Sequence, residues 1–205
     1  MPTFAEVFPS NDPVARFVVA MSIARNDIRH ALKQAGAAND LDSPDFTYWI
    51  RVASGHFFEA EGALREWRKV DEVRRFIEKL PSDGKDALGK VCSAVQKMGP
   101  GALEHVRERT FHYPSPVSRY RLDEELAEAL RALSDEEVGL VEADGFVRWC
   151  FADDVALVLA YDKHDPARLR EQSEIARDGA VGFVNFAQGA MEAYFGAHGL
   201  PALFD

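Results

Sequence analysis

Three dipeptides that end in proline mark the starts of the long amphipathic stretches of this sequence. Asp12-Pro13, Ser43-Pro44 and Asp165-Pro166 each place a capping side chain before a proline, which suits the first position of a helix. Behind each dipeptide, apolar residues recur with a period near 3.6, which puts them on one face of a helix. The sequence therefore predicts three long helices whose apolar faces pack together. Their approximate ranges are 13–36, 44–67 and 166–196.

Shorter helices and one hairpin are predicted for the rest of the chain. Proline and glycine breaks delimit helices over about residues 70–79, 86–98, 102–111, 123–133 and 153–161. Around Asp144-Gly145 the pattern changes to that of strands joined by a tight turn. The predicted fold class is mainly α, a helical bundle of about seven or eight helices. Residues 1–205 form a single domain in which residues 138–151 insert a β-hairpin.

Charge and composition narrow the range of functions. The net charge of −10 argues against a non-specific coat on nucleic acid. Residues 1–122 hold 18 basic and 16 acidic groups, whereas residues 123–205 hold 6 and 18, so a polyanion would meet the first part of the chain. Two cysteines, no signal peptide and no long apolar run predict a cytoplasmic protein that does not enter a membrane. No cofactor-binding motif is found, so no cofactor is predicted.

One motif, Arg-x4-His, combines a phosphate-binding side chain with one that titrates near neutral pH. It occurs at Arg107–His112, and again at Arg25–His30 and Arg51–His56. Residues five apart on a straight helix point about 140° away from each other, so the two copies inside predicted helices should diverge. The copy at Arg107–His112 precedes Pro114, where the chain can turn and bring the two side chains together.

An all-helical chain with Arg-x4-His at a helix end resembles the HEPN superfamily, which includes metal-independent ribonucleases, toxins and inactive binding members. The resemblance implies a metal-independent endoribonuclease or toxin-type regulator in which Arg107 holds the scissile phosphate and His112 is the general acid or base. Arg109 and Tyr113 would bind the substrate RNA. Arg and His of two protomers would meet in the cleft of a homodimer, and the 2′-hydroxyl would attack. The chain also resembles uncharacterised bacterial all-helical proteins, and this second resemblance does not point to any particular activity.

Two other functional interpretations stay open. In the first, the protein is a non-catalytic interaction or binding module, and His112 caps carbonyls in a packed corner. In the second, it is a metal-binding helical bundle that uses His30 and His56. Asp27 and Glu59 stand three residues from these histidines, on the same helix faces. A protein partner is compatible with either interpretation.

Two aromatic stripes and both cysteines are predicted to pack in the core, and each stripe also has a possible binding role. The stripe Trp49, Phe57, Phe58 and Trp67 is core or lines a ligand groove. The stripe Phe183, Phe186, Met191 and Phe195 is core or a dimer face. Cys92 and Cys150 are predicted to be buried thiols.

Overall fold

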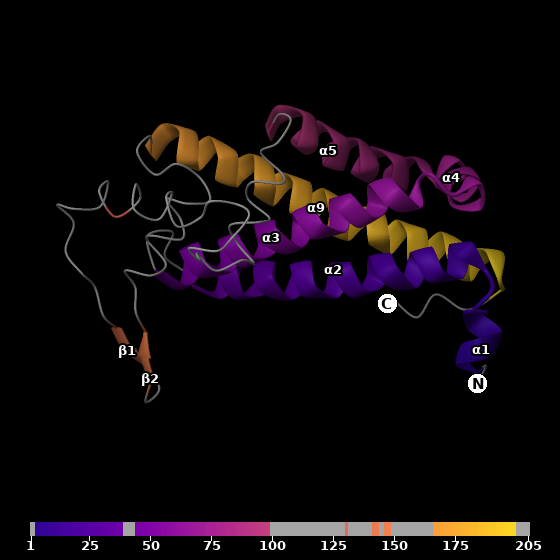
Figure 1. Ribbon diagram of the computed structural model, residues 1–205, viewed down its shortest axis with the longest axis horizontal. Coiled ribbons are helices and arrows are strands. Elements are labelled where there is room, and N and C mark those ends of the chain that lie inside the picture. Colours follow the sequence, from indigo (N-terminus) through magenta and orange to yellow (C-terminus); the bar gives the residue numbers. More distant parts are fainter. Residues whose placement is uncertain are drawn as a thin grey trace, which may run out of the picture.

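The computed structural model describes residues 3–38, 44–98, 130, 141–143, 146–148 and 166–199, and within them the protein is mainly helical (Figure 1). The helices are α1 (Phe4–Val7), α2 (Pro13–Ala37), α3 (Pro44–Trp67), α4 (Asp71–Glu78), α5 (Ser82–Met98) and α9 (Pro166–Ala197). Two strands, β1 (Val141–Ala143) and β2 (Phe146–Arg148), pair antiparallel with Glu142 opposite Val147. Asp144 and Gly145, the predicted turn between them, lie outside the described residues.

The mainly helical class is confirmed, and so are the three starts at Pro13, Pro44 and Pro166. Asp12 caps α2 as expected, because its Oδ1 accepts a hydrogen bond of 2.8 Å from the backbone N–H of Val14. The predicted helix over 86–98 begins four residues earlier, and α1 was not predicted. The helices predicted over 102–111, 123–133 and 153–161 fall almost entirely outside the described residues.

The long helices α2, α3 and α9 lie side by side in one bundle (Figure 1). Near the start of α2, Phe17 packs edge-on against Trp67 at the end of α3, and further along His30 packs against Trp49 near the start of α3. α2 and α3 are therefore antiparallel. Phe17 also contacts Phe186 of α9, with ring centroids 6.4 Å apart. One aromatic ring thus joins all three helices.

The two aromatic stripes form the core of this bundle. Phe57, Phe183 and Phe186 are completely buried, and Phe58 is nearly so. Trp67 and Met191 are partly buried against the same cluster. Phe57, Phe58 and Trp67 of the α3 stripe therefore belong to the core, whereas Trp49 is half-buried against His30. The stripe on α9 belongs to the core. Further fully buried members of the cluster are Val18, Met21, Ile28, Val73, Val91 and Tyr194.

Small residues bring α5 and α9 together in the most extensive helix pair of the described residues. The buried face of α5 consists of Gly84, Ala87, Val91 and Ala94. The prediction that Cys92 is buried was wrong, because this thiol is exposed. Cys92 stands one residue after Val91, so the helix turns it about 100° out of the small-residue face. Cys150 lies outside the described residues.

Tyr194 near the end of α9 holds the N-terminal segment against the bundle. Its hydroxyl donates a hydrogen bond of 2.9 Å to the carbonyl oxygen of Val7 and lies 3.4 Å from Oδ2 of Asp12. The ring of Phe8 stacks on Tyr194, with centroids 5.7 Å apart. Burial, followed by the negative charge of Asp12, raises the pKa of Tyr194 to about 12 from its ordinary value of 10.0.

We expect this tyrosine to make stability sensitive to alkaline pH. Above pH 10 the unfolded chain releases the Tyr194 proton while the folded chain keeps it, so the folded state loses about 2–3 kcal/mol between pH 10 and 12. Tyr194→Phe removes both the hydrogen bond and this titration. Urea unfolding should show the variant to be less stable by about 1 kcal/mol at pH 8. The difference should shrink and reverse above pH 10, and parallel pH profiles would contradict the assignment.

Candidate functional site: a basic pocket between α3 and α4

The residues that the HEPN resemblance makes catalytic or substrate-binding lie outside the described residues. These are Arg107, Arg109, His112 and Tyr113. The candidate site among the described residues lies at the junction of α3 and α4.

The other two Arg-x4-His copies lie inside α2 and α3, and in the α2 copy the two side chains have different neighbours. On α2, the ring of His30 contacts Trp49, with centroids 5.9 Å apart. Arg25 is half-buried and interacts electrostatically with Glu192 of α9. Burial, and then the positive charge of Arg29, lower the pKa of Arg25. The divergence expected from helix geometry is thus observed for this copy.

The described residues provide no metal site at His30 and His56. Asp27 and His30 are exposed on α2, whereas His56 is half-buried and Glu59 is exposed on α3. His56 is seven residues along α3 from Trp49, the neighbour of His30, and this places it about 10 Å further along the bundle. In the part of the chain that the structure describes, no three His, Cys, Asp or Glu side chains converge to hold an ion.

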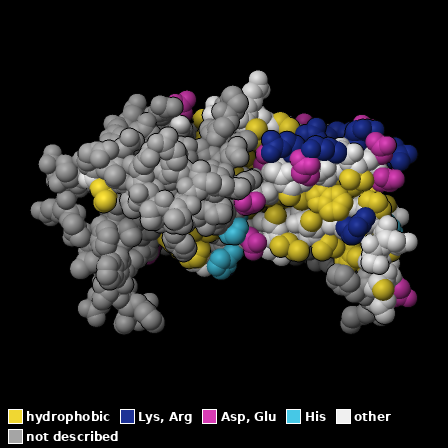
Figure 2. Space-filling model, viewed as in Figure 1, with side chains coloured by type: hydrophobic (Ala, Val, Ile, Leu, Met, Phe, Trp, Pro, Cys, Tyr) yellow, Lys and Arg dark blue, Asp and Glu magenta, His cyan; other side chains and the backbone are white. Residues whose placement is uncertain are grey.

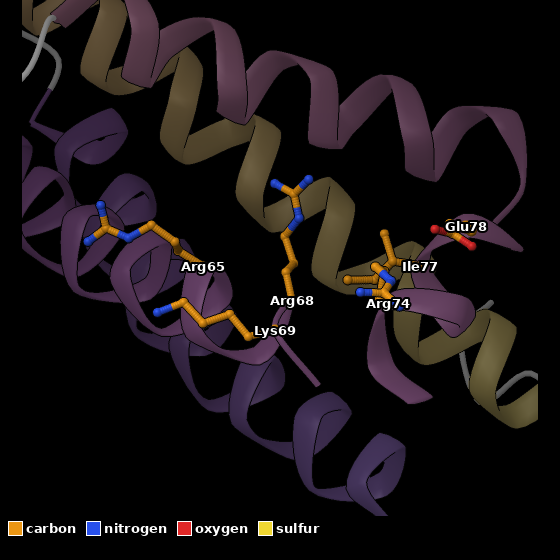
Figure 3. Close-up of a pocket in the computed structure, with 6 residues that line it drawn as sticks. All are labelled: Arg65, Arg68, Lys69, Arg74, Ile77 and Glu78. Atoms are coloured by element: carbon orange, nitrogen blue, oxygen red, sulfur yellow. The ribbon is translucent and has the colours of Figure 1, made fainter. Parts of the chain in front are cut away.

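A pocket with a basic lining lies where α3 ends and α4 begins (Figure 3). Its volume is about 440 Å³. We call it the basic pocket, and its lining residues are Arg65, Arg68, Lys69, Arg74, Ile77 and Glu78. Ile77 is buried and belongs to the core, whereas all the charged lining residues are exposed. Figure 2 shows Lys and Arg side chains gathered along the edge of the molecule over this end of the bundle.

The sequence builds this pocket by ending one helix and starting the next within four residues. Arg65, Arg68 and Lys69 stand at the C-terminal end of α3, where positive charge is favoured by the helix dipole. The backbone N–H of Arg68 bonds to the carbonyl of Leu64, which continues the last turn of the helix. The short connection then brings Arg74 of α4 to the opposite side of the pocket (Figure 3).

Only part of this positive charge is neutralised by neighbouring carboxylates. Lys69 forms an exposed ion pair of 2.7 Å with Glu66, and its hydrogen bond and charge lower the pKa of Glu66. Arg74 pairs with Asp71 at 2.7 Å. Arg65 and Arg68 form no ion pair with a carboxylate among the described residues, and Nη1 of Arg68 lies 3.9 Å from Sγ of Cys92. Two guanidinium groups therefore have no ion pair among the described residues, although the charge of Arg65 also contributes to lowering the pKa of Glu66.

The pocket has the chemistry of an anion-binding site. A guanidinium group presents a planar fork of N–H donors that matches phosphate oxygens. The lining contains no histidine, and its one carboxylate is the exposed Glu78. The residues that line the pocket can thus hold a phosphate group through their guanidinium and ammonium donors.

Comparison of the chain with models of protein families, with curated proteins and with solved structures finds no match. None of the helices described by the structure is both long enough and apolar enough to cross a membrane.

Proposed function

We propose that the protein is a helical RNA-binding protein that holds phosphate groups of the RNA in the basic pocket. The observation that carries the proposal is the presence of Arg65 and Arg68, which form no ion pair among the described residues, beside Lys69 and Arg74. The chain as a whole carries a net charge of −10, so the four basic side chains of the pocket contrast with the overall negative charge. Localised positive charge of this kind both attracts a polyanion and orients it.

A polymer of phosphates suits the pocket better than a single small anion. The cations come from two helices and extend along the open surface, so they can contact successive phosphates of one strand (Figure 3). The exposed ion pairs of Lys69 and Arg74 are worth little, so each cation can exchange its carboxylate for a phosphate at low cost. Binding of this type depends strongly on salt.

The combined substitution Arg65→Gln and Arg68→Gln tests this proposal. We expect it to weaken binding of a fluorescent single-stranded RNA by about 10-fold or more, measured by anisotropy at low salt. The slope of log Kd against log salt should fall by about one to two. The matched control, Lys85→Gln with Lys97→Gln, removes the same charge from exposed positions of α5 outside the basic pocket. Equal loss in both double variants would reject the pocket as the RNA site.

RNA cleavage is a second candidate function, and the motif Arg107–His112 favours it. In this proposal the protein is HEPN-like, Arg107 holds the scissile phosphate and His112 transfers the proton while the 2′-hydroxyl attacks. In this proposal the basic pocket contributes to RNA affinity and His112 to the proton transfer, so binding and cleavage are separable by mutation.

We extend the proposal to the organisation of the whole chain. Residues 1–205 form one cytoplasmic domain of seven or eight helices, into which the segment 138–151 is inserted as a hairpin. The strands β1 and β2 support the hairpin, since Val141 is paired with Arg148 and Ala143 with Phe146. The low cysteine content supports a reducing compartment.

A further inference from the structure

The outer face of α2 carries an apolar groove that the bundle leaves open. Ile23, with 61% of its side chain exposed, is the most exposed of the large hydrophobic residues among those described. The groove has a volume of about 560 Å³, and its lining residues come from α2 and from the N-terminal segment that precedes it. Its lining residues are Ala5, Phe8, Pro9, Ser10, Ala15, Arg16, Val19, Ala20 and Ile23.

The residues of α2 at this groove form one stripe with a charge at each end. Arg16, Val19, Ala20, Ile23 and Asp27 fall within an arc of about 100° and extend about 16 Å along the helix. Arg16 and Asp27 are both exposed. Neither forms an ion pair among the described residues. The stripe thus has an apolar centre, a cation at its N-terminal end and an anion at its C-terminal end.

This arrangement is complementary to itself under a two-fold rotation. If two copies of α2 pack antiparallel with the axis midway between Ala20 and Ile23, Ala20 lies opposite Ile23 of the partner subunit. The same rotation places Arg16 opposite Asp27 of the partner subunit, because Arg16 precedes Ala20 by four residues and Asp27 follows Ile23 by four. Each large side chain then meets a small one, and each charge meets its opposite.

We propose that this stripe of α2 is the contact surface for a second copy of the same chain. A second copy is the occupant that the surface fits, because both charges and the small-against-large pairing are satisfied by the stripe itself. The contact is independent of the basic pocket, which lies on α3 and α4. Because the stripe spans only about three turns of helix, the dimer is weak and dissociates in the micromolar range.

Sedimentation of the full-length chain between about 1 and 200 μM tests the proposal. We expect a reversible monomer–dimer equilibrium in which Ile23→Glu raises Kd by about 10-fold or more. The control Val181→Glu changes another exposed aliphatic residue, on α9, and should leave Kd unchanged. A monomer at every concentration would overturn the proposal, and so would a dimer that is indifferent to Ile23→Glu.

Charge exchange tests the antiparallel register independently of the apolar centre. Arg16→Asp alone and Asp27→Arg alone each place like charges opposite one another, so each should raise Kd several-fold. The combined variant restores both pairs and should return Kd to within about 3-fold of the original value. Additive weakening in the combined variant would overturn the register. Because both positions are exposed, urea unfolding should show all three variants to be as stable as the original monomer.

Discussion

Replacing Gly179 by alanine should lower the free energy of unfolding by about 1–3 kcal/mol, although alanine is the better helix former. A Cβ atom at this position of α9 would lie 2.6 Å from Cζ of Phe57 and 2.8 Å from Cβ of Ala94. Phe57 is completely buried, and Ala94 has its Cβ directly on the backbone of α5. Neither neighbour can move aside without displacing packed residues, so α9 and α5 would have to separate.

The matched control is Gly62→Ala in the interior of α3, where a Cβ would meet nothing within 4 Å. This substitution should raise the free energy of unfolding by about 0.5–1 kcal/mol, because alanine loses less backbone entropy in a helix. Urea unfolding at neutral pH measures both changes. Opposite signs are expected, and stabilisation by both substitutions would show that α5 and α9 pack less closely at Gly179. Phe57→Leu should lower the free energy of unfolding less in the Gly179→Ala variant than in the original protein, because the two sites are in contact.

The long helices could be predicted from the sequence because their start signals are local. The side chain of Asp12 and the proline after it determine where α2 begins, and no distant residue is needed. The four-residue α1 is too short to show a helical period. It is held by contacts with Tyr194, which lies 187 residues away from Val7 in the sequence. Its position therefore depends on the tertiary fold.

The error at Cys92 has a related cause. Apolar periodicity treats cysteine as a small hydrophobic residue and places it beside Val91 on the inward face. The structure selects a narrower face, because Gly182 and Gly189 of α9 lie close to the backbone of α5 at Ala87, Val91 and Gly84. Cys92 lies outside that narrow contact and next to Arg68. How wide a buried face becomes depends on the partner helix, which the local pattern does not specify.

The basic pocket could not be located from linear charge patterns, although its residues are close in sequence. Between residues 65 and 79 six basic side chains alternate with four acidic ones, which resembles an ordinary solvated helix surface. The sequence signal that could have located the pocket is the helix break at Lys69–Val70. The break changes the direction of the chain between α3 and α4 and places Arg74 opposite Arg65 and Arg68. The structure adds the pairing of carboxylates with Lys69 and Arg74, which leaves two arginines for a ligand.

Substitution of His112 by alanine should lower the rate of RNA cleavage by about 10²–10⁴-fold if the chain is a HEPN-like ribonuclease, because this is the usual loss on removal of a general acid or base. The reaction is measured with purified protein in the presence of a chelator, and its products should carry 2′,3′-cyclic ends. His105→Ala is the matched control, since it removes another histidine of the same segment outside the Arg-x4-His motif. The control should retain cleavage, and both variants should unfold at the same urea concentration as the original protein.

The binding and cleavage proposals can be separated by their kinetic signatures. Loss of Arg65 and Arg68 removes phosphate contacts made before and during the reaction, so it should raise KM and leave kcat nearly unchanged. Loss of His112 removes a proton transfer, so it should lower kcat and leave RNA affinity intact. Equal cleavage by the His112→Ala variant and the original protein would reject the ribonuclease, while RNA binding that still depends on Arg65 and Arg68 would leave a non-catalytic binding module.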